Sequence, residues 1–184
     1  NHQQYKANLH THTTRSDGRF SPQTVVDEYH KLGYKILAIT DHNEVTFPWT
    51  DFVNMEASDR SKERLENGVL GREALTYENR DPETLGMFAI QGNEVSTPHH
   101  INSFFSGYEQ RTDQEEIALE AIESRDGVTF INHPGRYTDK NPEKYNTNWY
   151  VDILNRFDHI AGIEVYNSAD RYPNDRQLWD SILV

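Results

Sequence analysis

The chain has 184 residues, a formal net charge of −12 and no cysteine. This length fits one compact domain, and the acidic balance argues against a general nucleic-acid binder because it repels a phosphate backbone. Without cysteine the chain has no disulfides, no thiolate nucleophile and no sulfur ligands, so histidine and carboxylate side chains are its available strong metal ligands.

The sequence gives no sign of a membrane segment. No stretch approaches the roughly 20 apolar residues that cross a bilayer, and no signal-peptide pattern opens the chain. We therefore expect a soluble protein without a membrane partner. Because the first residue is Asn1 instead of Met, its location stays open between the cytoplasm and export after removal of a signal.

Strand and helix alternate from the start of the chain. Residues 5–10 are predicted to form a strand that ends in polar residues. Ser21 and Pro22 predict a helix start, with serine as the N-cap and proline in the first turn, and Gly33 predicts its end. The nearly continuous apolar run 34–40 predicts a strand that is buried on both faces.

The middle of the chain is less regular. Residues 47–86 are charged and weakly periodic, so we expect one or two solvated helices there, with 60–66 the best candidate. Beyond them the pattern predicts strands at 87–91, 101–108, 128–132 and 160–166, and helices at 113–124, 149–157 and from 175 onward. This alternation predicts an α/β fold with a mostly parallel sheet, either open or closed into a barrel.

Polar side chains gather where the predicted strands end. In open and closed α/β folds alike, the active site lies at the C-terminal ends of the strands. Five potential metal ligands lie at or just past such ends: His10, His12, His42, Glu94 and His133. We expect residues that are distant in sequence to converge there on one edge.

Each of these residues also has an ordinary structural interpretation. Two histidines in an H-x-H pair share one face of an extended strand and can reach one ion, yet surface histidines two apart are common. Asp17 before Gly18 is typical of an Asx-turn. Glu94 fits either a helix cap or a carboxylate that bridges two cations. Their joint occurrence favours the metal-binding interpretation.

The motifs together resemble a known family. The segment NLHTHTTRSDGRFSPQTVVDEYHKLGYKILAITDHNEVT resembles the opening of the polymerase and histidinol phosphatase (PHP) superfamily, in which H-x-H, S-D-G and T-D-H occur in this order. GNEVS, HHINSFF, INHPGR and GIEVYN resemble its later blocks. The resemblance implies a distorted (β/α)7 barrel, with about seven βα units closing the sheet.

The resemblance also implies a set of metal ligands, namely His10, His12, Asp17, His42, Glu94, His100 and His133. Glu94 would bridge two of the ions. His100 is preferred because family members have their ligand directly before a similar apolar segment, and His99 remains the alternative. A complete site would hold two or three divalent ions, with zinc, manganese and iron all suited to these ligands.

By this resemblance the chain hydrolyses a phosphate ester with metal-activated water. Its substrate would be a small phosphorylated molecule, and Glu94, His42 and Arg136 are the expected catalytic residues. Arg136 follows the H-P-G motif and would position the phosphate. Arg15 and Arg171 are alternatives, and a structural salt bridge is an equal expectation for each arginine.

Two other classes of function compete with this one. The chain could be a catalytically weak metal-binding or scaffold domain that serves a partner domain, and metal content together with turnover would separate the two. A barrel hydrolase that cleaves a carbon–nitrogen bond commonly uses a carboxylated lysine. No lysine ends a predicted strand here, which weakens that alternative.

The end of the chain lacks one expected motif. Family members close their cluster with an Asp-x-His pair on a late strand, and none follows GIEVYN before Val184. We therefore expect residues 1–184 to form a single, C-terminally incomplete domain, with more chain and a possible further domain beyond Val184. If the chain is complete, Glu164 or Asp170 would have to finish the site.

Overall fold

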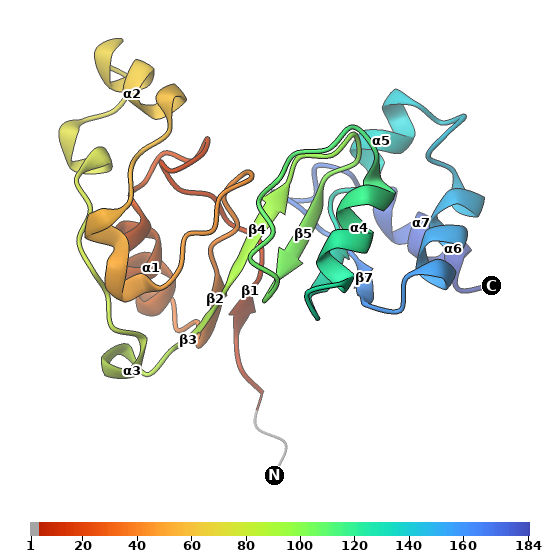
Figure 1. Cartoon of the computed structure of the whole chain (residues 1–184), viewed down its shortest axis with the longest axis horizontal. Helices are drawn as coiled ribbons and strands as arrows, with labels where there is room; N and C mark the ends of the chain where they lie inside the picture. The colour runs from red at the N-terminus through yellow and green to blue at the C-terminus, as the bar shows by residue number, and fades with distance from the viewer. Residues whose placement is uncertain (1–3) are drawn as a thin grey trace. The chain divides into compact units, whose positions relative to one another are not determined.

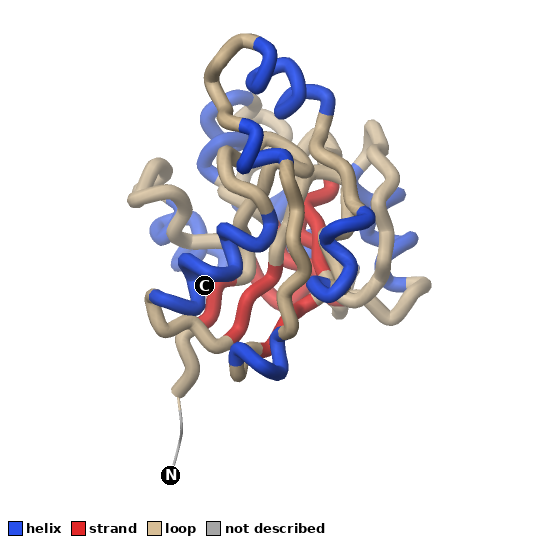
Figure 2. The backbone as a smooth tube through the Cα atoms, turned by 90° about the vertical axis from the view of Figure 1, so that its left-hand side faces the viewer, coloured by secondary structure: helices blue, strands red, loops and turns tan. Residues whose placement is uncertain are grey.

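The computed structural model describes residues 4–184, and these form two compact units. The first unit comprises the residues up to Glu94 together with Gly107–Glu109, and the second comprises Val95–Ser106 and Gln110–Val184. Figure 1 shows strands and helices in both parts of the chain, and in Figure 2 long loops connect short strands. The predicted α/β class is confirmed.

The first unit contains a parallel three-stranded sheet in the order β1-β2-β3. Its strands are β1 (Ala7–Asn8), β2 (Ile36–Ala38) and β3 (Phe88–Ile90). β2 lies between the other two and pairs in parallel with both, as an apolar strand buried on both faces should. Each observed strand is shorter than the sequence predicts.

The described part of the first unit contains five helices: α1 (Pro22–Lys31), η1 (Trp49–Asn54), α2 (Asp59–Glu66), η2 (Arg72–Leu75) and α3 (Pro82–Leu85). α1 begins after Ser21, with proline in its first turn, and the chain leaves it through Gly33 at φ 80°. α2 confirms the helix predicted near 60–66.

The middle segment is more buried than its charge suggests. Trp49 and Phe52 of η1 are at most 1% exposed, and they pack in one core with Leu37, Ile39 and Tyr77. Burying a large apolar side chain contributes about 1.5 to 3 kcal/mol, so this segment stabilises the first unit. The sequence pattern predicted the solvated helix α2 but missed the burial of Trp49 and Phe52, because 3₁₀ turns and loops bury aromatic residues without helical periodicity.

The chain passes from the first unit to the second within β4 (Gly92–Val95), which is buried throughout. The sheet of the second unit contains β5 (Ile101–Phe104), β6 (Val128–Ile131) and β7 (Ile160–Ile163). β5 runs antiparallel to β6, and β6 runs parallel to β7. The helices of this unit are α4 (Glu115–Glu123), α5 (Gly135–Lys140), α6 (Thr147–Arg156) and α7 (Asp175–Ile182).

Two expectations about topology need correction. The strands of residues 4–184 belong to two sheets, whereas a (β/α)7 barrel closes its strands into a single one. The antiparallel pairing of β5 with β6 also makes the second sheet mixed.

No helix in residues 4–184 is both long and apolar enough to span a membrane.

Candidate metal centre

Glu94 lies at the centre of a group of histidines in the first unit. Its side chain is 1% exposed; Oε1 lies 3.5 Å from His10 Nε2, and Oε2 lies 3.2 Å from both His12 Nε2 and His42 Nδ1. The two histidines of the H-x-H pair also meet, with 3.2 Å between their Nε2 atoms. One buried carboxylate therefore faces three imidazoles with both of its oxygens.

Asp17 meets the same histidines from the other side. Its Oδ1 lies 3.4 Å from His12 Nδ1 and 3.8 Å from His42 Nε2. His12 and His42 thus each direct one ring nitrogen toward Glu94 and the other toward Asp17. This arrangement gives two possible ligand groups that share His12, one of His10, His12 and Glu94 and one of His12, Asp17 and His42.

The spacing of these atoms suits a metal ion. Two ligands that bind one tetrahedral ion at about 2.1 Å lie roughly 3.4 Å apart, and the carboxylate-to-imidazole distances around Glu94 are 3.2 to 3.5 Å. Imidazole and carboxylate together suit zinc, manganese and iron. The residues therefore fit the divalent cations that the sequence leads us to expect.

The backbone around the candidate ligands differs from the sequence prediction. β1 ends at Asn8, whose side chain accepts the N–H of His10, so the H-x-H pair lies beyond the strand and not on its face. Glu94 lies inside β4 instead of past a strand end. Its backbone bonds to the segment after β2, since its N–H donates to Asp41 O and its carbonyl accepts from Asn43 N.

Asp41 holds the loop that joins two of the candidate ligands, His12 and Asp17. Its buried carboxylate accepts four hydrogen bonds: from Thr13 N and Thr13 Oγ1 at 2.7 Å each, and from Ser16 Oγ and Thr46 Oγ1 at 2.6 Å each. Gly18 closes the loop tightly, because a Cβ there would lie 2.5 Å from the His12 carbonyl oxygen. The loop geometry thus depends on a carboxylate that is not itself a candidate ligand.

The second unit brings together two further predicted ligands. The rings of His100 and His133 have centroids 5.7 Å apart. His133 follows β6, whereas His100 precedes the antiparallel strand β5, so both lie at the same edge of this sheet. His133 also meets Glu164, whose Oε2 accepts from His133 N at 2.8 Å and lies 3.3 Å from His133 Nδ1.

The sequence suggests Glu164 as a site residue only for the case that the chain is complete. Its position after a strand nevertheless indicates that it lies near His133. It directly follows β7, a strand parallel to β6, so its side chain arrives at the edge where His133 lies. A carboxylate beside a histidine can fix the ring orientation and its protonated nitrogen. The position of Glu164 after a parallel strand therefore marks it as a candidate site residue. The motif GIEVYN alone does not assign it a role.

His99 and His100 have different surroundings. Nδ1 of His99 lies 3.1 Å from the His100 carbonyl and Nε2 lies 2.9 Å from Tyr150 Oη, while Tyr137 and Trp149 stack on its ring. Burial holds the pKa of His99 well below its usual value. His99 is therefore a neutral core residue with both nitrogens engaged, and we retain His100 as the proposed ligand.

The three candidate arginines have different environments. Arg15 donates to Val45 O at 2.8 Å and pairs with Glu44 at 2.7 Å, so it ties down the segment after His42. Arg136 is in the first turn of α5, with its guanidinium 5.6 Å from the centre of its neighbour's ring, Tyr137. Arg171 is exposed. Arg15 thus has the salt bridge that was one of its two expected roles.

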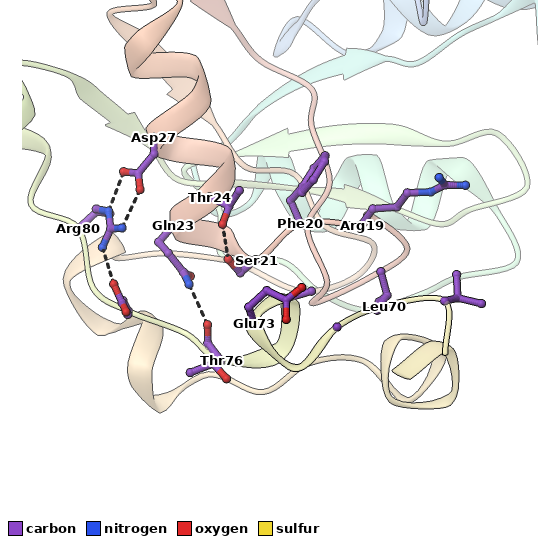
Figure 3. A pocket seen from close by; sticks show the side chains of 14 residues that line it. Arg19, Phe20, Ser21, Gln23, Thr24, Asp27, Leu70, Glu73, Thr76 and Arg80 are labelled. Atoms are coloured by element: carbon purple, nitrogen blue, oxygen red, sulfur yellow. Dashed lines mark hydrogen bonds and ion pairs between the residues drawn. The ribbon is translucent and has the colours of Figure 1, made fainter. Parts of the chain in front are cut away.

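A separate pocket of about 880 Å³ lies between α1 and η2 (Figure 3). Figure 3 shows Arg80 paired with Asp27, and Gln23 donating to the Thr76 carbonyl at 2.8 Å. None of the candidate ligands in the described chain lines this pocket. It does not coincide with the candidate metal centre.

Comparison with known proteins shows the family. A profile of the PHP domain matches residues 8–117. Because this match covers more than half of the chain, the chain belongs to the PHP domain family. No curated protein matches the chain.

Three solved structures are similar in fold. A two-domain protein from Bacteroides vulgatus containing a predicted PHP-like metal-dependent phosphoesterase is 23% identical with a TM-score of 0.61, over 96% of this chain and 49% of its own. A proposed metal-dependent phosphoesterase from Bifidobacterium adolescentis is 14% identical, with a TM-score of 0.59. The match covers 98% of this chain and 84% of the Bifidobacterium protein. An amidohydrolase from Chromobacterium violaceum, with bound sulfate and no metal, is 14% identical, with a TM-score of 0.55. The match covers 94% of this chain and 81% of the Chromobacterium protein. This chain thus spans about half the length of the first, and these identities show the fold alone.

Proposed function

We propose that this chain hydrolyses a phosphate ester of a small molecule at a centre of two or three divalent metal ions. The observation that carries this proposal is the position of Glu94, whose two carboxylate oxygens face the ring nitrogens of His10, His12 and His42. Membership of the PHP domain family supports a metal-dependent hydrolase. Zinc, manganese or iron would suit the ligands.

The residues have distinct roles in this proposal. Glu94 would bridge two cations, His10 and His12 would complete one of these sites, and Asp17 with His42 would hold a further cation. Cations bound there would polarise a phosphoryl oxygen and lower the pKa of a bound water to about 7. No side chain then has to serve as the nucleophile, which suits a chain without cysteine.

The second unit holds the other residues of this proposal. His100 and His133 are the proposed ligands there, and Glu164 would orient His133 through its Nδ1 atom. Arg136 would bind the phosphate by charge-assisted hydrogen bonds. In this proposal Arg136 binds substrate and Glu164 positions a ligand.

Two of the similar structures agree with a phosphoesterase, since they are described as such. The Chromobacterium violaceum protein is an amidohydrolase with bound sulfate. Sulfate is a tetrahedral dianion like phosphate, so its binding there is compatible with an anion site in this fold. Its described class keeps amide hydrolysis as the competing reaction to be tested.

The test is an assay of the purified protein, reconstituted separately with zinc, manganese and iron, against a phosphomonoester, a phosphodiester and an amide. We expect turnover of a phosphoester, and loss of that turnover in the Glu94→Gln variant. Glu66→Gln is the matched control, because Glu66 is an exposed glutamate at the end of α2. Turnover of the amide alone would replace the proposed reaction, and metal binding without turnover would favour the scaffold function.

A further inference from the structure

Hydrogen bonds connect helix α2 to the loop that carries Asp17. The hydroxyl of Ser58, its N-cap residue, donates to the Ser16 carbonyl at 2.5 Å. Near the other end of the helix, the Nη1 atom of Arg64 donates to the carbonyl oxygens of Asp17 and Gly18 at 2.8 and 3.1 Å. The middle segment of the sequence therefore places a helix directly beside the candidate metal centre.

This attachment brings the side chain of Arg60 to a candidate ligand. Its Nη1 lies 3.6 Å from Asp17 Oδ2, while Oδ1 of the same carboxylate faces His12 and His42. The Arg60 side chain is 60% exposed. A guanidinium with access to solvent thus lies at the edge of the group formed by His12, Asp17 and His42.

Two other arginines that contact this loop or the segment after His42 are already engaged. The guanidinium of Arg15 bonds to Val45 O, Thr46 Oγ1 and Glu44, and that of Arg64 bonds to the two loop carbonyls. Within residues 4–184, Asp17 is the one charged side chain that forms an ion pair with Arg60. Exposed ion pairs are weak, so Arg60 can exchange this partner at little cost.

An anionic substrate needs local positive charge here, because the chain has a net charge of −12. A guanidinium binds phosphate through paired, charge-assisted hydrogen bonds. A carboxylate that is bound to a cation attracts a second positive group less strongly, which favours release of Arg60 toward an incoming anion. We propose that Arg60 binds the phosphoryl group of the substrate at the edge of this centre.

The inference rests on the proposed function for the identity of the anion as a phosphate ester, yet it can be tested without turnover. The probe is inorganic phosphate, titrated calorimetrically into the manganese-loaded and the metal-free protein. Arg60→Ala is compared with Arg60→Lys and with Lys62→Ala. Lys62 is the matched control, since it is a cation on the same helix that pairs with Glu56 and Asp59.

We expect Arg60→Ala to weaken phosphate binding to the loaded protein by about tenfold, the loss of one charge-assisted contact. Arg60→Lys should retain part of the affinity, and Lys62→Ala should match the wild type. Metal content should be the same in all four proteins. If the wild type binds phosphate through Arg60 but hydrolyses no ester, the proposed function fails while this inference stands.

Three outcomes would overturn the inference. Phosphate affinity that is unchanged by Arg60→Ala would remove Arg60 from the anion site. Absence of phosphate binding by the wild type would do the same. Loss of metal together with phosphate in Arg60→Ala would show that Arg60 acts by holding Asp17 instead of binding the anion.

Discussion

The carboxylate of Asp41 accepts hydrogen bonds from both the backbone N–H and the hydroxyl of Thr13, each at 2.7 Å. Because Asp41 is fully buried, this contact fixes the backbone immediately after the candidate ligand His12 without exposing another charge to the centre. It links the end of the β2 segment to the loop that leads to Asp17.

Asp41→Asn should destabilise the protein and loosen its metal site. The amide of asparagine keeps one acceptor oxygen, but its NH₂ group would face the donors that now bind the second carboxylate oxygen. We expect the free energy of unfolding to fall by about 2 to 4 kcal/mol. Denaturant unfolding and metal titration would measure both effects. The control is Asp51→Asn, whose carboxylate is exposed and accepts from Asn54. Equal stability of the two variants would contradict the role of Asp41.

Glu94→Gln should damage activity more than Arg136→Ala. The carboxylate faces three histidines and is proposed to support two cations, whereas the arginine would contribute one charge-assisted contact. Steady-state kinetics should show kcat and metal content falling together for Glu94→Gln, and mainly a higher KM for Arg136→Ala. Mild and equal effects of both would remove Glu94 from direct metal binding.

Substitution of the two adjacent histidines should separate structure from metal binding. His99 is enclosed by Tyr137, Trp149 and Tyr150, so His99→Gln should lower the unfolding temperature without removing metal from the folded protein. His100→Gln should lower metal content and leave the unfolding temperature of the metal-free protein nearly unchanged. The opposite pattern would make His99 the ligand.

Asp175 predicts a dependence of stability on pH. Burial raises its pKa to about 6, although Gly135 N–H donates to its Oδ1 at 2.6 Å. Between about pH 3.9, the usual aspartate value, and pH 6, the unfolded chain loses this proton while the folded protein keeps it. This group therefore lowers the free energy of unfolding as pH rises through that window, and the loss persists above it.

Asp175→Asn should remove this loss. Thermal unfolding should show little difference between variant and wild type near pH 4 and a higher unfolding temperature for the variant at pH 7.5. Asp180→Asn, an exposed position on the same helix α7, controls for the change in net charge. A difference of the same size at both pH values would rule out titration of Asp175 as its cause.

Local signals predicted the elements of this fold well where they were strong. Serine, proline and glycine define α1, and the apolar run 34–40 contains β2. The middle segment was misjudged, since Trp49 and Phe52 are buried through 3₁₀ and loop structure that has no helical period. α5 was missed because it begins directly after Pro134, where a turn is the simpler prediction.

The candidate site was predictable in composition but less so in geometry. Five predicted ligands meet in the first unit, yet His10 and His12 do so from a loop and Glu94 from within a strand. Asp41 was not among the predicted ligands, and only the fold shows that it organises the loop. The contribution of α2 depends on contacts between residues more than 40 positions apart, which no local pattern reveals.

The most direct test of the account is the metal content of the folded protein after reconstitution with zinc, manganese or iron and removal of free ion. We predict about two equivalents or more per chain for at least one ion, and a clear reduction in the Glu94→Gln variant. Less than about one equivalent with each of the three ions would contradict the metal centre around Glu94, and with it the proposed hydrolysis.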